Sequence, residues 1–180
     1  GNKGVKLSDD YFQIMQVPQA YDVDGAALNE HYLNLQRQFH PDRFADKSAQ
    51  EQRLAVQMAS VVNQAHDTLR SPLLRAAYLL KLRGLDSSGE NTTISDVAFL
   101  MSQMQLREQL GAVSSAANPF AELDLVATEV SSQLANLQQQ FGEQYGQQTF
   151  DTAAETLIKM QFYSKLQLEV DELEDTLDDV

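Results

Sequence analysis

The fold is decided by residues 24–70, which read DGAALNEHYLNLQRQFHPDRFADKSAQEQRLAVQMASVVNQAHDTLR. Asp24 is a good N-cap, and apolar residues follow it on one helix face at spacings of 4, 3 and 4: Leu28, Tyr32, Leu35 and Phe39. This helix is expected to stop at His40, because Pro41 disfavours helical backbone angles in the residue before it. A second long helix is expected over 48–70, so the two would pair antiparallel as a helical hairpin.

The second helix of this hairpin has an apolar stripe of its own, made of Leu54, Met58, Val61, Ala65 and Leu69. A shorter helix is expected on each side of the hairpin. The first spans about 9–16, with Ser8 as its cap and Leu7 stapled against Phe12. The other spans about 73–83 and follows a Ser-Pro pair, which is a typical helix start.

The second half of the chain begins with two more expected helices. Thr93 and Asp96 together resemble a capping box, which would open a helix that runs to about 110. Pro119 opens the next helix. The apolar residues of this second helix share one face: Val126, Val130, Leu134, Leu137 and Phe141.

Gly142 and Gly146 are expected to bracket a turn, after which a last helix spans about 149–177. Its apolar stripe consists of Ile158, Phe162, Leu166, Val170, Leu173 and Leu177. Three helices with apolar stripes and short connections predict a small bundle. Strand signals are absent, so we expect an all-α protein.

The 180 residues carry a formal net charge of −13, and this charge is distributed unevenly. Residues 1–84 have ten Lys or Arg and nine Asp or Glu, whereas residues 85–180 have three and seventeen. Two halves of such different charge indicate two modules with different partners. The polar, Gly-containing stretch between them predicts a linker. We expect a tail at 1–8, a first domain at 9–84, the linker at 85–92 and a second domain at 93–180.

Composition excludes several classes of function. The chain has no cysteine, which excludes disulfides, a cysteine nucleophile and thiolate metal or iron–sulfur sites. Its acidity disfavours binding to nucleic acid. No apolar run approaches the length of a membrane span, and no secretory signal is present. We therefore expect a cytoplasmic protein without a cofactor or bound metal.

The tripeptide His40-Pro41-Asp42 would by itself indicate only a turn. Here it lies in an expected exposed loop at 40–47, between two long helices with a short helix on either side. This context resembles the J domain of DnaJ-type co-chaperones, which carry His-Pro-Asp in this loop. Further motifs resemble the HscB family of J-type co-chaperones: Tyr11-Phe12, Leu35–Phe39, Arg43-Phe44, Asn63–Ala65, Thr68-Leu69, Pro72, Ala98–Met101 and Leu106–Glu108.

The resemblance implies a protein that acts through two binding surfaces. One surface would stimulate ATP hydrolysis by the DnaK-like chaperone HscA, and it would comprise His40, Pro41, Asp42, Arg37, Arg43 and Lys47. Arg43 stands where many J domains have lysine, so the charge is retained. No nucleophile–base pair or phosphate-binding loop is apparent, so we expect this protein to have no catalytic residues of its own.

The other surface would bind the iron–sulfur scaffold protein IscU, and the resemblance places it on Leu100, Met101, Met104, Gln105, Glu108, Ala112 and Phe162. By spacing alone, Leu100, Met101 and Met104 are typical of a core stripe, whereas the resemblance implies an outer face. Gln105 and Ala112 are neutral where the family often has acids. Phe162 shares a stripe with core positions and is expected to be partly buried.

Three alternatives remain open at the level of sequence. A general J-domain adaptor would share the loop but deliver a different client to a DnaK-type chaperone. A purely structural helical protein would use the tripeptide only as a turn. A hydrolase would need a nucleophile beside His40 and Asp42, and the sequence places none there.

Overall fold

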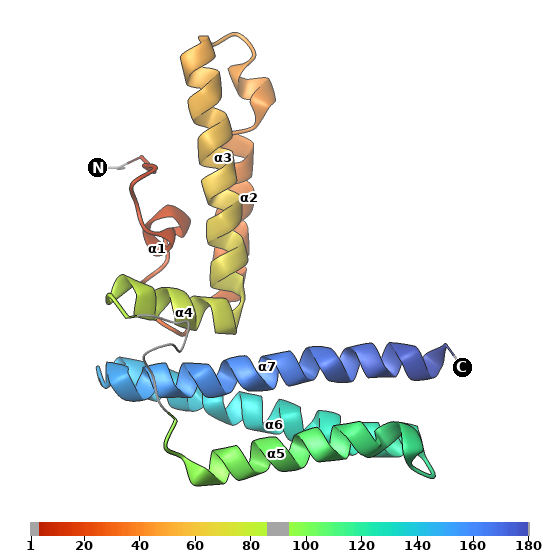
Figure 1. Cartoon of the computed structure of the whole chain (residues 1–180). Helices are drawn as coiled ribbons and strands as arrows, with labels where there is room; N and C mark the ends of the chain where they lie inside the picture. Colours follow the sequence, from red (N-terminus) through yellow and green to blue (C-terminus); the bar gives the residue numbers. More distant parts are fainter. Residues whose placement is uncertain (1–3, 86–93, 180) are drawn as a thin grey trace. The chain divides into compact units, whose positions relative to one another are not determined.

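The computed structural model describes residues 4–85 and 94–179, and every regular element in these two ranges is a helix (Figure 1). The chain forms two compact units, Gly1–Leu79 and Leu80–Val180. The division falls within α4, Pro72–Leu82, whose first turn is capped by Ser71 as expected. The predicted linker at 85–92 lies, apart from Leu85, outside the described residues.

The first unit opens with the short helix α1, Tyr11–Met15. Its cap is Asp10 rather than the predicted Ser8: the Gln13 N–H donates to the Asp10 carboxylate at 2.8 Å, and the Gln13 side chain accepts from the Asp10 N–H at 2.8 Å. This reciprocal capping box satisfies two backbone donors at once. Because the cap moves by two residues, Leu7 no longer holds the stapling position, and it is exposed.

A helical hairpin of α2, Gly25–Gln38, and α3, Ala49–Arg70, forms the body of this unit. The predicted Asp24 cap is confirmed, because Asp24 accepts from two backbone N–H groups of α2. Helix α3 is capped by Ser48, whose hydroxyl accepts from the Glu51 N–H. The expected loop at 40–47 contains a short 3₁₀ helix, η1, Pro41–Phe44.

The predicted stripe on α3 was displaced by one residue at two positions. Ala55 and Val62 are buried, whereas Leu54 is half exposed and Val61 is only partly covered. Each pair of neighbours is apolar, so spacing alone did not choose between them. Both α1 and α2 pack on α3, and a small residue such as Ala55 allows closer approach of their backbones than a leucine would.

Two side chains tie the loops of the first unit to its helices. His31 on α2 donates from Nδ1 to the Met15 carbonyl at 2.7 Å, which satisfies an orphan acceptor at the end of α1. Arg75 on α4 donates to the Tyr21 carbonyl at 2.5 Å and to the Leu69 carbonyl at 2.6 Å. These bonds hold α1, α4 and the loop before α2 against the hairpin.

The second unit contains a bundle of three long helices, as predicted: α5, Val97–Ala112, α6, Pro119–Gly146, and α7, Phe150–Asp178. A short 3₁₀ helix, η2, Val113–Ser115, lies between the first two. Asp96 itself caps α5 by accepting from the Phe99 N–H, so it is not the third residue of a capping box. The proposed partner Thr93 lies outside the described residues.

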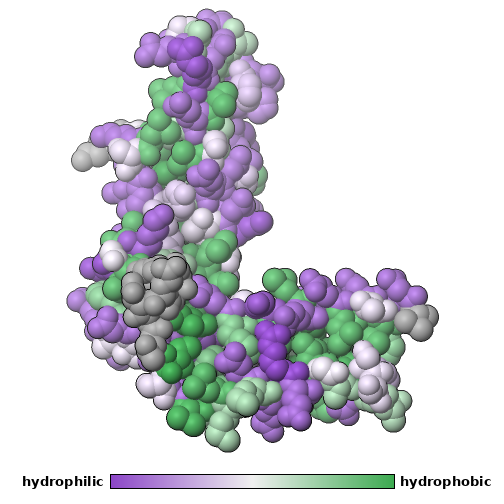
Figure 2. Space-filling view, viewed as in Figure 1, coloured by the Kyte–Doolittle hydropathy of each residue, from purple (hydrophilic) through white to green (hydrophobic). Residues whose placement is uncertain are grey.

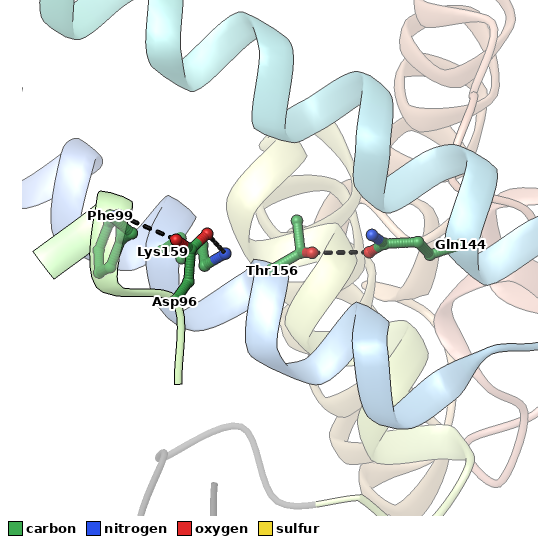
Figure 3. Close-up of polar contacts among 5 residues, drawn as sticks. All are labelled: Asp96, Phe99, Gln144, Thr156 and Lys159. Atoms are coloured by element: carbon green, nitrogen blue, oxygen red, sulfur yellow. Dashed lines mark hydrogen bonds and ion pairs between the residues drawn. The ribbon is translucent and has the colours of Figure 1, made fainter. Parts of the chain in front are cut away.

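The predicted turn between Gly142 and Gly146 was wrong, because α6 continues through both glycines. Flanking helix formers and the buried Phe141 outweigh the modest cost of glycine inside a helix. The turn follows instead at residues 147–149, where Gln148 adopts a left-handed φ of 62°. It brings α7 back against α6, and the buried Thr156 hydroxyl donates to the Gln144 side chain at 2.6 Å (Figure 3).

The core of the second unit lies mainly between α6 and α7. On α7 the fully buried residues include Ala153, Leu157, Met160 and Leu166. Ile158 and Phe162, which were predicted on the same stripe, are only half buried. The buried face of α7 is therefore rotated and broader than a single stripe, because α7 packs against α6 on one side and against α5 on another.

Candidate functional site

The loop between α2 and α3 presents a histidine and an aspartate in a defined arrangement. His40 is the N-cap of η1, and its Nδ1 accepts from the Asp42 N–H at 3.2 Å. Because Nδ1 is an acceptor, the proton of the neutral imidazole resides on Nε2. The side chains are 58% and 93% exposed, with Asp42 Oδ2 3.6 Å from Nδ1. The loop thus offers one N–H donor and one carboxylate acceptor to a partner.

Pro41 is the first residue of η1 and fixes the backbone between these two groups. Gln52 on α3 anchors the other end of the loop: its Nε2 donates to the carbonyls of Phe44, Ala45 and Lys47 at 2.9, 3.4 and 3.3 Å. Neither end of the loop is therefore free to change conformation without breaking local bonds. The role of Gln52 could not be predicted, because it depends on contacts that only the folded loop makes.

A groove of about 650 Å³ lies beside the loop, between α2 and α3. Four of the six predicted chaperone-binding residues line it: Arg37, His40, Pro41 and Arg43. Asp42 and Lys47 are exposed but lie outside its lining. The structure brings five further residues to the groove that sequence reasoning missed: Leu33, Gln36, Phe39, Ala59 and Asn63.

A short hydrogen-bond network connects the two walls of this groove. Tyr32 donates to the Asn63 side chain at 2.7 Å, and Gln36 donates to the Tyr32 hydroxyl at 2.6 Å. Leu33 is 45% exposed. It is an apolar residue that lies off the buried stripe of α2, and this position was the one sign in the sequence that it could belong to a binding surface. The groove therefore combines an apolar patch, amide groups and two arginines.

His66 on α3 stacks on Tyr32, with ring centroids 3.8 Å apart and an interplanar angle of 4°. Burial lowers the pKa of His66, and the positive charge of Arg70 adds to this effect. The neutral form of the ring is thus favoured next to the hydrogen-bond network of the groove. This histidine packs between the helices of the hairpin and has a structural role.

The second candidate surface is the outer face of α5. Leu100, Met101 and Met104 are 41%, 66% and 72% exposed, so they form no part of the core. Val97, one turn before them, is equally exposed, and the sequence analysis did not single it out. We call these four residues the docking stripe. In Figure 2, apolar surface gathers over the N-terminal end of α5.

The remaining predicted residues of this surface lie around the docking stripe. Gln105, Glu108 and Ala112 continue the same face of α5 and are exposed. Phe162 comes from α7 and is half buried, with its ring meeting Phe99 edge-on at 5.7 Å. Phe99 is buried on the inner face of α5, where its ring contacts Phe162.

Two charged pairs connect α5 with α7. Lys159 donates to Asp96 at 2.8 Å (Figure 3), and Arg107 pairs with Glu169 while its guanidinium lies 5.4 Å from the centre of the Phe162 ring. The hydrogen bond from Lys159, joined by the Phe99 N–H, lowers the pKa of the Asp96 carboxyl. The sequence analysis used Asp96 only as part of a capping box and Arg107 only as part of a family motif, and it predicted neither of the two cross-helix pairs.

No described helix is long and apolar enough to cross a membrane. In the same part of the chain, no group of three acidic or histidine side chains is placed so that it could hold a metal ion. Both candidate surfaces consist of exposed groups on helices and a loop, which suits them to binding another protein.

Comparison with known proteins gives matches to both the second unit and the whole chain. Residues 95–171 match the family described as the HSCB C-terminal oligomerisation domain. The structure of the chaperone HscB from Vibrio cholerae is 37% identical with a TM-score of 0.83, and the match covers 94% of this chain and 99% of that one. Human co-chaperone protein HscB is 27% identical with a TM-score of 0.83, covering 96% and 85%. The Jac1 co-chaperone from Saccharomyces cerevisiae, 20% identical with a TM-score of 0.68, covering 91% and 97%, shares the fold.

Proposed function

This chain belongs to the HscB family of co-chaperones, and from that membership we propose that it delivers the scaffold protein IscU to the DnaK-like chaperone HscA. In doing so it stimulates ATP hydrolysis by HscA and promotes transfer of iron–sulfur clusters in the cytoplasm. The observation that carries the proposal is the presence of two exposed surfaces of different chemistry in two separate units. We assign residues 9–84 to a J domain and 93–180 to a scaffold-binding domain, with a tail at 1–8 and a linker at 85–92.

The loop surface would act on HscA by binding and not by catalysis. A partner that stabilises one conformation of the ATPase shifts its population only if it binds that conformation more tightly. The Nε2–H of His40 and the carboxylate of Asp42 are directional groups that can distinguish two such conformations. Arg37, Arg43 and Lys47 surround them with positive charge, which favours an acidic surface on the chaperone.

The docking stripe would bind IscU through apolar contact. Leu100, Met101 and Met104 present flexible, exposed side chains, and methionine adapts well to an irregular partner surface. Phe162 would extend this contact onto α7. Gln105 and Glu108 supply polar rim groups, whereas Ala112 adds only a methyl group, so the charge contribution of the rim is small.

A general J-domain adaptor for another client remains the alternative. It would require the same loop but no particular second unit. The match of residues 95–171 to the HscB C-terminal family supports IscU as the client.

The proposal is tested by the steady-state ATPase rate of HscA, measured with this protein alone, with IscU alone and with both. We expect this protein to raise the rate, and we expect a further rise when IscU is added. A general adaptor would raise the rate by itself but show no binding to IscU in a pull-down. A protein in which the tripeptide is only a turn would leave the rate unchanged.

A further inference from the structure

The docking stripe contributes little to holding its own helix in place. Of the sixteen residues of α5, only Phe99 and Leu106 are buried. The four stripe residues face outward, so their burial cannot fix the helix on the bundle in the free protein. Another set of contacts must therefore fix where the stripe lies relative to Phe162 on α7.

Three cross-helix pairs supply these contacts in a constant register. Asp96 pairs with Lys159, Phe99 with Phe162, and Arg107 with Glu169. The two ion pairs join residues 63 and 62 positions apart in the sequence. A constant offset means that α5 and α7 run parallel and are matched turn for turn. At about 1.5 Å per residue, the two ion pairs are about 16 Å apart along α5 and lie on either side of the docking stripe.

Arg107 has a particular place in this register. Its guanidinium lies over the ring of Phe162 and also pairs with Glu169, two turns further along the same face of α7. The Phe162 ring therefore contacts both Phe99, at right angles, and the guanidinium of Arg107. A planar guanidinium is suited to both contacts at once.

We propose that Arg107 and Glu169 are positioning residues for scaffold binding: their pair holds α5 on α7 so that the docking stripe and Phe162 form one continuous surface before the partner arrives. This inference rests on the proposed function, since it concerns the same surface. It adds two residues to that surface that act through Phe162 and α5 and need not touch IscU. Preorganisation of this kind increases affinity because less ordering remains to be done on binding.

The test is a double-mutant cycle on the full-length chain, with the affinity for IscU as its readout. We expect Arg107→Gln and Glu169→Gln each to weaken binding about fivefold, and the double variant to be little weaker than the weaker single one. The charge swap Arg107→Glu with Glu169→Arg restores the ion pair and is expected to recover most of the loss. Glu172→Gln on α7 removes the same charge without touching the pair, and it should bind like the wild type.

A direct contact of Arg107 with the partner would give a different pattern. Arg107→Gln would weaken binding, Glu169→Gln would not, and the charge swap would be no better than Arg107→Glu alone. That pattern would overturn the inference while leaving the proposed function intact. Equal thermal unfolding midpoints of the variants would show that the domain itself is folded in each.

A second measurement tests, without IscU, whether the pair of Arg107 and Glu169 holds α5 in place. Amide hydrogen exchange in residues 97–112 should become faster in both single variants, by similar factors, and return toward the wild-type rate in the charge swap. Unchanged exchange would contradict a positioning role. If the wild-type chain fails to bind IscU, the proposed function fails, and the exchange result alone decides whether the pair holds α5.

Discussion

The two candidate surfaces differ in chemistry and in how they are held in place. The loop around His40 is polar and is held by backbone bonds at both ends, from the His40 cap at one end to Gln52 at the other. The docking stripe is apolar and exposed, and two charged pairs join its helix to α7. The loop is therefore suited to distinguishing conformations of a partner, whereas the stripe is suited to holding a partner in place.

The largest effect is expected from His40→Gln, which should abolish the activity of the loop surface and leave that of the docking stripe intact. Glutamine cannot cap η1 and present an N–H donor in the same geometry, so the directional contact is lost. Stimulation of the HscA ATPase should fall to the unstimulated rate, because loss of the contact removes the preference for one conformation. Affinity for IscU and the helical circular dichroism should remain unchanged. A folded variant that still stimulated HscA would show that the loop is not the active surface.

The next effect is expected at the docking stripe. Leu100→Ala combined with Met104→Ala removes two anchors and should weaken IscU binding about 30-fold, if each anchor contributes about 1 kcal/mol. Isothermal titration with IscU measures this loss, while stimulation of HscA in the absence of IscU should persist.

A matched control for this variant lies elsewhere on the same bundle. Leu125 on α6 and Leu168 on α7 are 66% and 64% exposed, so their replacement by alanine removes a similar apolar area. We expect that control to bind IscU like the wild type. Equal losses in the two double variants would mean that the stripe has been misplaced.

A smaller effect on the loop side is expected from Gln52→Ala. The variant loses the donor to three loop carbonyls but leaves His40, Pro41 and Asp42 in place. Loss of about 1 kcal/mol of hydrogen bonding should reduce stimulation of HscA about fivefold. The exposed Gln57 on the same helix offers the control substitution Gln57→Ala. If both variants stimulated the HscA ATPase equally well, the anchoring of the loop by Gln52 would not contribute to stimulation.

The smallest effect concerns acid stability, which should differ between the two units. The pKa of His66 is lowered in the fold, so the unfolded chain binds a proton more readily and the first unit loses stability as the pH falls below about 6.5. The pKa of Asp96 is also lowered, but its ordinary value is near 3.8, so the second unit loses this contribution only in more acidic solution, as the pH falls below that value.

Urea unfolding followed by circular dichroism at pH 7 and pH 5 measures this difference. His66→Phe keeps an aromatic ring against Tyr32 and removes the titrating group, so it should reduce the loss of stability between these two pH values. Asp96→Asn should leave the loss of stability between pH 7 and pH 5 unchanged. A wild-type protein with no loss of stability between pH 7 and pH 5 would contradict the effect of His66.

Local signals made much of this architecture predictable. Asp24, Ser48 and Pro119 mark helix starts by the chemistry of their own side chains, and Pro41 marks a helix end. The face of α3 was less predictable, because Leu54 and Ala55 are both apolar and only the packing of α1 and α2 chooses between them.

The sites were predicted unevenly for the same reason. The tripeptide in the loop is contiguous in sequence and is therefore visible there, whereas the groove beside it is lined by residues far apart in sequence, such as Leu33 on α2 and Asn63 on α3. The link from Arg107 to Phe162 and Glu169 depends on the register between two helices that are distant in sequence. Such pairs have no local signal, so only the folded bundle reveals them.

Delivery of IscU to HscA requires one chain to carry both surfaces. The ATPase rate of HscA with IscU tests this requirement, in a comparison of the wild type with an equimolar mixture of the His40→Gln variant and the Leu100→Ala, Met104→Ala variant. Each variant keeps one working surface, but the two surfaces are no longer on the same molecule, so the gain from effective concentration is lost. We expect the mixture to lack the additional stimulation by IscU that the wild type shows. A mixture as active as the wild type would contradict the claim that this protein delivers one partner to the other.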